Sequence, residues 1–232
     1  MIRQIPNIIT LLNLFSGCIA IAMAFAGNFQ ASFIWIVIAA GFDFFDGFTA
    51  RLLGVSSKLG VELDSLADVV SFGVAPAAAL FVVLSDITIS IDISWANILP
   101  YSAFLIPAFS AYRLAKFNID TRQTTSFLGL PTPANGLFWI SYAYALNRCN
   151  IDGNETIVVL ISIGLVLLMS VLMVSELPMF SLKLKGFTFK SAFRQIITGI
   201  AMLILVVVWG ISGVAGGIVV YILISMLTIK RA

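Results

Sequence analysis

The chain alternates between long apolar stretches and short polar connections from one end to the other. A helix needs about 20 mostly apolar residues to cross the hydrocarbon core of a membrane. Such stretches recur along the whole chain, and no linker between them is long enough to separate two domains. The pattern predicts a single all-α domain over residues 1–232, a polytopic transmembrane helical bundle of about eight helices. The expected spans are Ile8–Ala26, Ala31–Leu53, Leu63–Leu84, Asn97–Lys116, Ala134–Leu146, Thr156–Val174, Phe193–Trp209 and Ile211–Ile229.

Composition agrees with a membrane protein and excludes several kinds of catalytic chemistry. Hydrophobic residues make up 60% of the chain and charged residues 10%, whereas a soluble domain has about 45–50% and about 25%. The sequence contains no histidine, which excludes serine–histidine triads, HExxH zinc sites and a phosphohistidine intermediate. The two cysteines, Cys18 and Cys149, lie far apart without metal-ligand spacing. We therefore expect an apolar packing residue and a free loop thiol.

Lysine and arginine residues concentrate on one side of the predicted bundle. With eight spans, that side holds twelve of the thirteen, which are Arg3, Arg51, Lys58, Arg113, Lys116, Arg122, Lys183, Lys185, Lys190, Arg194, Lys230 and Arg231. The other side holds Arg148. Basic residues are retained on the cytoplasmic side of a membrane. We therefore expect a multi-pass protein of the cytoplasmic membrane, with both termini in the cytoplasm.

Acidic residues gather at the cytoplasmic ends of the second and third predicted spans. Five of the eleven lie between positions 43 and 68, and they are Asp43, Asp46, Glu62, Asp64 and Asp68. A charge at the centre of a membrane helix costs about 2.5–3.5 kcal/mol on insertion scales, so such residues are candidates for function. They could instead be interfacial and paired with Arg51 and Lys58, but two cations cannot neutralise five carboxylates.

The spacing of these residues indicates that their side chains converge. Asp43 and Asp46 are three residues apart and share one face of a helix. Gly60, Asp64 and Asp68 follow one another at intervals of four, so they share a face as well. Two such helices side by side would bring four carboxylates together. Oxygen ligands without histidine or cysteine favour Mg²⁺ or Mn²⁺, and magnesium is commonly bound by carboxylates together with substrate phosphate. The cluster therefore indicates phosphate chemistry.

The same segment resembles a known family signature. It reads Asp43-x2-Asp46-Gly47-x2-Ala50-Arg51-x8-Gly60-x3-Asp64-x3-Asp68. This pattern is similar to the signature of the CDP-alcohol phosphotransferase family at every fixed position. The resemblance implies a membrane enzyme that transfers a phosphatidyl-type group from a CDP-linked lipid to an alcohol. It also implies a six-helix catalytic core, about residues 5–175, followed here by two extra helices, about residues 193–229.

The resemblance further implies roles for individual residues. Two metal ions, Mg²⁺ or Mn²⁺, would be held by four carboxylates, those of Asp43, Asp46, Asp64 and Asp68. Asp68 would also be the catalytic base for the incoming hydroxyl. Gly47, Arg51 and Ser57 match positions that bind the CDP part of the lipid. Physical chemistry agrees, since glycine lets a pyrophosphate approach the helix and arginine offers a fork of donors to phosphate oxygens. Helix packing for Gly47 and interfacial anchoring for Arg51 are the alternatives.

Flanking segments resemble the bacterial and archaeal phosphatidylserine synthases within this family. These segments are Ile5–Gly17, Glu62–Ala77, Tyr112–Asn118 and Phe127–Gly136. The resemblance implies CDP-diacylglycerol and L-serine as substrates, membrane lipids as surroundings, a homodimer, and no nucleic-acid partner. Candidate contacts to the serine acceptor are Arg113, Lys116, Asn118 and Ser71. Arginine suits the serine carboxylate because it can form a bidentate contact.

Other functions stay open at this point. The same transfer could use glycerol 3-phosphate or an inositol phosphate, although a phosphorylated acceptor would need more cations than Arg113 and Lys116. These two residues could also be positive-inside anchors. A divalent-cation transporter could use the carboxylates as a permeation site. It would need polar residues through the full membrane depth, whereas this cluster stays in the cytoplasmic half of two spans.

Two local patterns predict details of the helices. Pro131-Thr132-Pro133 is expected to begin a helix, because proline fits the first helical turn. Gly213 and Gly217 form a small-x3-small pattern that is expected to pack the last two spans together.

Overall fold

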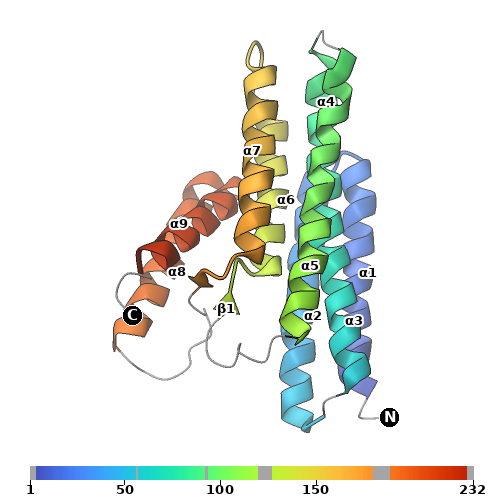
Figure 1. Cartoon of the computed structure of the whole chain (residues 1–232), viewed down its shortest axis with the longest axis vertical. Helices are drawn as coiled ribbons and strands as arrows, with labels where there is room; N and C mark the ends of the chain where they lie inside the picture. The colour runs from blue at the N-terminus through green and yellow to red at the C-terminus, as the bar shows by residue number, and fades with distance from the viewer. Residues whose placement is uncertain (1–3, 56, 92–93, 120–126, 180–188, 229–232) are drawn as a thin grey trace.

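The computed structural model describes residues 4–55, 57–91, 94–119, 127–179 and 189–228. Helices α1 to α7 lie along one long axis, and α8 and α9 lie obliquely beside α6 (Figure 1). In chain order the elements are α1 (Ile5–Phe25), α2 (Phe29–Leu53), α3 (Lys58–Asp68), η2 (Val69–Val74), α4 (Ala75–Ile89), η3 (Ser94–Phe104), α5 (Leu105–Ile119), β1 (Phe127–Leu128), α6 (Thr132–Arg148), α7 (Glu155–Val174), β2 (Pro178–Met179), α8 (Phe189–Trp209) and α9 (Ser212–Thr228).

Each predicted span corresponds to a helical stretch, and the expectation of an all-α polytopic bundle is confirmed. Four stretches of the described chain are long and apolar enough to cross a membrane, namely Ile5–Phe25, Phe29–Leu53, Lys58–Ile89 and Glu155–Val174. The fourth predicted span divides into the 3-10 helix η3 and α5, with Pro100 inside η3. Proline cannot donate the backbone hydrogen bond that a continuous α-helix requires. The chain is a multi-pass membrane protein.

Two short strands, which the sequence pattern did not predict, connect the segments before α6 and after α7. They pair antiparallel, with Phe127 opposite Met179 and Leu128 opposite Pro178. Each strand has two residues, too few for an apolar–polar alternation to be recognised along the sequence.

Local sequence explains where several helices begin and end. The side chain of Asn28 accepts a hydrogen bond from the backbone N–H of Ala31 at 3.0 Å and caps the start of α2. The same helix ends at Leu53 and is capped by Gly54, whose φ of 63° suits glycine. Helix α6 begins at Thr132, directly after Pro131, with Pro133 in its first turn. The predicted helix start at Pro131-Thr132-Pro133 is therefore confirmed.

Glycines set the close contacts between the last two helices. A β-carbon at Gly213 would collide with the backbone carbonyl of Leu205, and one at Gly217 would lie 2.8 Å from the side chain of Met202. The expected packing of α8 against α9 through this pair is confirmed. Helix α9 in turn packs on α6, so both C-terminal helices attach to the bundle mainly through one neighbour.

The long helix that carries Asp64 and Asp68 changes its winding immediately after Asp68. Residues Val69–Val74 form a π-helical segment, η2, before the α-helix resumes. Glycines allow close approach here: β-carbons at Gly17 on α1 and Gly136 on α6 would approach Ser71 and Phe72 of the segment, and one at Gly73 within it would approach Pro107 of α5. The segment is therefore packed closely by α1, α5 and α6. Such wide turns within α-helices often occur at functional sites, and this one begins directly after Asp68.

Basic residues of the described chain lie at both ends of the bundle. Arg51 and Lys58 lie where α2 leads to α3, and Arg148 lies at the opposite end, where α6 leads to α7 (Figure 1). Several residues behind the predicted orientation lie outside the described residues: Arg3, Arg122, Lys183, Lys185, Lys230 and Arg231. For Lys190 and Arg194 the backbone alone is described.

Candidate metal and substrate site

Three carboxylates meet between α2 and α3. One oxygen from each of Asp43, Asp64 and Asp68 lies within 4.8 Å of the others. Asp43 comes from α2, and the other two residues come from α3, one helical turn apart. Asp68 is 7% exposed. The convergence that the three- and four-residue spacings predicted is present for these three side chains.

Asp46 lies beside this group and not within it. Its Oδ2 accepts a hydrogen bond of 2.7 Å from the Thr10 hydroxyl on α1, and the residue is 6% exposed. Asp46 and Asp64 both line a cavity between α1, α2 and the start of α3. The carboxylate group and the cavity are therefore adjacent, with Asp64 belonging to both.

The donor atoms of this region fit a hard divalent cation. Asp64 Oδ1 is buried and has no hydrogen-bond partner among the described residues. Asn13 Nδ2 donates to Asp68 Oδ1 at 3.4 Å, while Asn13 Oδ1 is a second buried oxygen without a partner in the described chain. Unpartnered buried oxygens are costly unless something binds them. Several carboxylate oxygens close together suit Mg²⁺ or Mn²⁺ better than softer metals.

A cavity of about 440 Å³ opens next to the carboxylates, between α1, α2 and the start of α3. This volume lies in the range of small-molecule sites, about 300–1,000 Å³. Its lining comprises Pro6, Asn7, Thr10, Asp46, Gly47, Ala50, Arg51, Gly54, Val55, Ser57, Gly60, Val61 and Asp64. All three residues that the resemblance assigned to CDP binding, Gly47, Arg51 and Ser57, are in this lining.

The geometry of the cavity explains the small residues of the motif. A β-carbon at Gly47 would lie 3.4 Å from Arg51 Nη1, so the guanidinium group extends over the glycine. The Ser57 hydroxyl accepts a hydrogen bond from the Gly60 backbone N–H at 2.9 Å and caps α3. A β-carbon at Gly60 would be 3.0 Å from that hydroxyl and 3.1 Å from Asn7 Oδ1. A guanidinium group above bare backbone suits phosphate oxygens.

Substitution of Gly47 tests this cavity. If a CDP-linked lipid binds in this cavity, as the resemblance implies, we expect Gly47→Leu to displace the Arg51 guanidinium and raise the KM for that lipid by roughly tenfold or more, the cost of one charge-assisted hydrogen bond. Gly41→Leu is the matched control, because Gly41 lies on the same helix and a β-carbon there meets nothing within 4 Å. Steady-state kinetics of both variants provide the measurement, and equal effects at the two positions would contradict the assignment.

The four acceptor candidates lie in different surroundings. Arg113 on α5 is 8% exposed, and its Nη1 donates to the Thr132 hydroxyl at 2.9 Å. Its Nε is buried without a partner among the described residues, and the guanidinium interacts electrostatically with Asp68. Ser71 is fully buried and donates to the backbone carbonyl of Asn13 at 3.0 Å. Arg113 is thus the candidate that has both a spare donor and an interaction with the carboxylate group.

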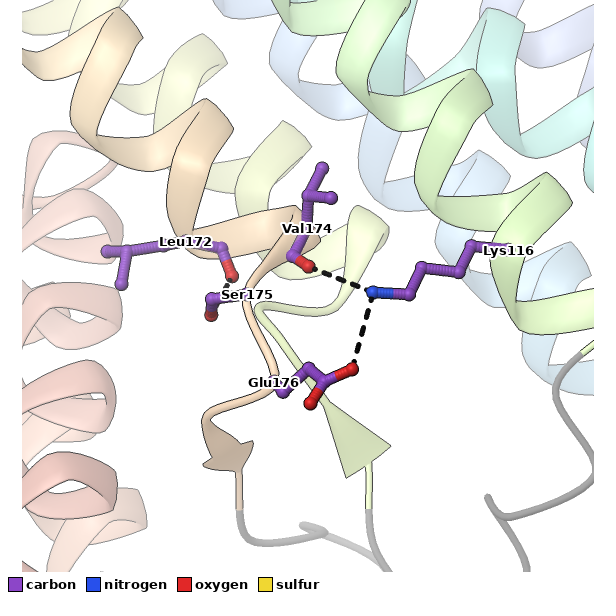
Figure 2. A network of polar contacts seen from close by, with 5 residues as sticks. All are labelled: Lys116, Leu172, Val174, Ser175 and Glu176. Atoms are coloured by element: carbon purple, nitrogen blue, oxygen red, sulfur yellow. Dashed lines mark hydrogen bonds and ion pairs between the residues drawn. The ribbon is translucent and has the colours of Figure 1, made fainter.

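The remaining two candidates are bound to other parts of the protein. Asn118 Nδ2 donates to the Ser65 hydroxyl at 2.9 Å. Lys116 extends from α5 toward the end of α7, where its Nζ lies 3.4 Å from the backbone oxygen of Val174 and 3.8 Å from Glu176 Oε1 (Figure 2). The structure therefore does not bring Lys116 and Arg113 to one point.

Helix α1 supplies polar groups that were not among the predicted site residues. Asn7 and Thr10 line the cavity, and Asn13 contacts Asp68. These residues recur at every third position in an otherwise apolar stretch, so they lie along one face of the helix. That regular polar face was a signal in the sequence. The role of Thr132 as the partner of Arg113 had no such signal.

The chain resembles one family of known proteins over most of its length. Residues 3–229 match the model of the CDP-alcohol phosphatidyltransferase family. A CDP-diacylglycerol–serine O-phosphatidyltransferase of Methanocaldococcus jannaschii is 32% identical over 217 residues, which are 92% of this chain and 94% of the relative. One from Helicobacter pylori is 35% identical over 176 residues, 74% of this chain and 70% of the relative. An archaetidylserine synthase of Methanothermobacter thermautotrophicus is 35% identical over 131 residues, 56% of this chain and 53% of the relative.

Proposed function

Because this chain belongs to the CDP-alcohol phosphatidyltransferase family, we propose that it transfers the phosphatidyl group of CDP-diacylglycerol to the hydroxyl of L-serine. The products are phosphatidylserine and CMP. The observation that carries the proposal is the group of Asp43, Asp64 and Asp68 beside a cavity that Arg51 lines. The names of the relatives support serine as the acceptor and CDP-diacylglycerol as the donor.

In this proposal the carboxylates bind two divalent cations, Mg²⁺ or Mn²⁺. The ligands are Asp43, Asp46, Asp64 and Asp68. Ions bound there would polarise the phosphoryl oxygens and stabilise the leaving phosphate. The family as a whole is metal-dependent, and the unpartnered Oδ1 of Asp64 supports a ligand role for that residue.

The protein side chains position the reactants and move one proton. Arg51 and Ser57 bind the CDP part, with the pyrophosphate lying over Gly47. Asp68 accepts the proton of the serine hydroxyl as its oxygen bonds to phosphorus, and the bond from phosphorus to the CMP oxygen breaks. A poor nucleophile such as an alcohol needs this assistance at neutral pH. The amide of Asn13 holds Asp68 in place through its Nδ2.

Arg113 binds the carboxylate of the acceptor in this account. Its buried guanidinium has a donor without a partner in the described chain and interacts with Asp68. Ser71 and Asn118 stay candidates for the ammonium group. Transfer to glycerol 3-phosphate or an inositol phosphate is the alternative. The test supplies the purified enzyme with CDP-diacylglycerol and each labelled alcohol in turn, and a labelled lipid formed from serine alone supports the proposal. Labelled lipid formed from a phosphorylated alcohol alone contradicts it.

We propose that the protein resides in the cytoplasmic membrane with its active site facing the cytoplasm. The position of Arg51 and Lys58 at the cavity end of the bundle supports this orientation. We also propose that the protein forms a homodimer and that its catalytic core spans about residues 5–175. The family resemblance supports both proposals.

The orientation predicts opposite accessibility for two thiols. In intact cells, a membrane-impermeant maleimide should label the native Cys149, which is exposed near the α6–α7 connection. With Cys149 replaced by serine, a cysteine introduced by Ser57→Cys should react after the membrane is opened and not before. A Cys18→Ala background removes the remaining thiol. Labelling of the Ser57→Cys protein in intact cells would refute the orientation.

A further inference from the structure

The end of α7 is held by contacts from two separate segments. The backbone oxygen of Leu172 accepts hydrogen bonds from the Ser175 hydroxyl at 2.8 Å and from the Leu130 backbone N–H at 3.1 Å. The backbone oxygen of Val174 accepts one from Lys116 Nζ, which also pairs with Glu176 (Figure 2). The last carbonyl groups of a helix have no partner within it. Here α5 and the segment before α6 supply some of those partners.

The segment before α6 is fixed to the same place through its backbone. Beyond the β1–β2 pairing, the Gly129 backbone N–H donates to the Leu177 oxygen at 2.9 Å. Gly129 has a φ of 75°, and a β-carbon there would collide with the Met173 oxygen and lie 2.9 Å from that of Ser175. Only glycine permits this close approach of two backbones.

These contacts form a closed circuit that begins and ends on α5. The Arg113 guanidinium donates a hydrogen bond to Thr132, the first residue of α6. Two residues earlier in the chain, the Leu130 backbone N–H donates to the Leu172 oxygen at the end of α7. From there Val174 and Glu176 lead back to Lys116, three residues after Arg113 on the same helix. The contacts of Lys116 that hold the end of α7 against α5 therefore also help to hold the Thr132 hydroxyl that orients Arg113.

We infer that Lys116 and Glu176 form a clamp that positions Arg113 for the acceptor carboxylate, and that Lys116 is not itself an acceptor ligand. The inference rests on the proposed function. Lys116 points to the α7 end, and its amino group is shared between a backbone oxygen and a carboxylate. Binding of an acceptor carboxylate beside Arg113 would draw the amino group away from these two partners.

The clamp predicts a selective change in kinetics. Lys116→Met keeps the length of the side chain but removes the donor and the charge. We expect the KM for L-serine to rise by about three- to tenfold, because a partly exposed ion pair and one hydrogen bond from a charged group are modest interactions. The KM for CDP-diacylglycerol should change less than twofold. Lys116→Arg, which can still donate to Val174 and pair with Glu176, should restore most of the serine KM.

The Glu176→Gln variant distinguishes a clamp role of Lys116 from direct binding of the acceptor by Lys116. If Lys116 acts through the clamp, this variant raises the serine KM in the same direction, and its effect is not additive with that of Lys116→Met. If Lys116 binds the acceptor directly, loss of Glu176 leaves the lysine freer and the serine KM unchanged or lower, which would overturn the inference. Equal increases in both KM values for Lys116→Met, as expected from general damage, would overturn it as well.

Arg148→Met provides the matched control, because it removes a cation at the opposite end of the bundle. Thermal unfolding in detergent establishes that each variant is folded. A wild-type enzyme that makes no lipid from serine would refute the proposed function. The clamp is then tested through the KM of the alcohol that the labelled panel identifies, so the two failures are distinguishable.

Discussion

Asp68→Asn is expected to lower turnover by about 10²–10⁴-fold, the usual contribution of a general base, while the protein still binds CDP-diacylglycerol. Asp68 is 7% exposed and lies in the carboxylate group with Asp43 and Asp64. Asparagine keeps the size of the side chain and an oxygen that can accept from Asn13 Nδ2. The variant therefore removes the proton acceptor with little change in packing. Turnover and titrated lipid binding, both at saturating metal, are the measurements.

The matched control for this prediction is Asp86→Asn. Asp86 lies near the other end of the same long helix, away from the carboxylate group. Its substitution should leave turnover unchanged. Two results would count against the base assignment: an Asp68→Asn enzyme of near wild-type rate, or one whose defect is repaired by more metal. The second result would leave Asp68 as a ligand alone.

Asp43→Asn is expected to weaken the binding of metal and of the CDP-linked lipid together. Asp43 is the carboxylate that α2 adds to the two from α3. Loss of a partner that merely orients a metal ligand costs about 10–100-fold in affinity, so loss of a ligand should raise the Mg²⁺ concentration for half-maximal activity by about 100-fold. In the unmodified enzyme, chelation with EDTA should abolish turnover, and Mg²⁺ or Mn²⁺ should restore it.

Glu62→Gln controls for the loss of an acidic charge in the same region. Glu62 is exposed on α3 and does not belong to the carboxylate group. Calorimetric titration with Mn²⁺ measures metal binding without turnover. An Asp43→Asn protein that binds Mn²⁺ and lipid like the Glu62→Gln protein would contradict the ligand role, and full activity in chelator would contradict metal dependence altogether.

The spacing of apolar and acidic residues in the sequence was sufficient to predict the helices and most of the carboxylate group. Apolar stretches indicated where the helices lie, because the hydrocarbon core sets a minimum length for a span. Four stretches of the described chain reach that length, whereas the predicted span Ala134–Leu146 is shorter. The three- and four-residue intervals predicted that four carboxylates converge, and the structure brings Asp43, Asp64 and Asp68 together. Asp46 lies beside that group. The helix start at Pro131-Thr132-Pro133 was also predictable, because the fixed backbone angle of proline fits the first turn of a helix.

Other features depend on contacts between distant segments and could not be predicted. The π-helical segment Val69–Val74 forms where α1, α5 and α6 approach closely, and no local pattern in that segment specifies it. The partner of Lys116 is 58 residues away along the chain. A lysine near a membrane surface looks alike in sequence whether it anchors the helix, binds a substrate or clamps another helix.

The most direct test of the account is CMP release by the purified protein. The assay contains CDP-diacylglycerol and Mg²⁺, with and without L-serine, and each condition is repeated in excess EDTA. We expect CMP to appear in proportion to phosphatidylserine, to require L-serine, and to stop appearing in the chelator. CMP release that does not depend on L-serine but increases with glycerol 3-phosphate, or that continues unchanged in EDTA, would contradict metal-dependent transfer to serine.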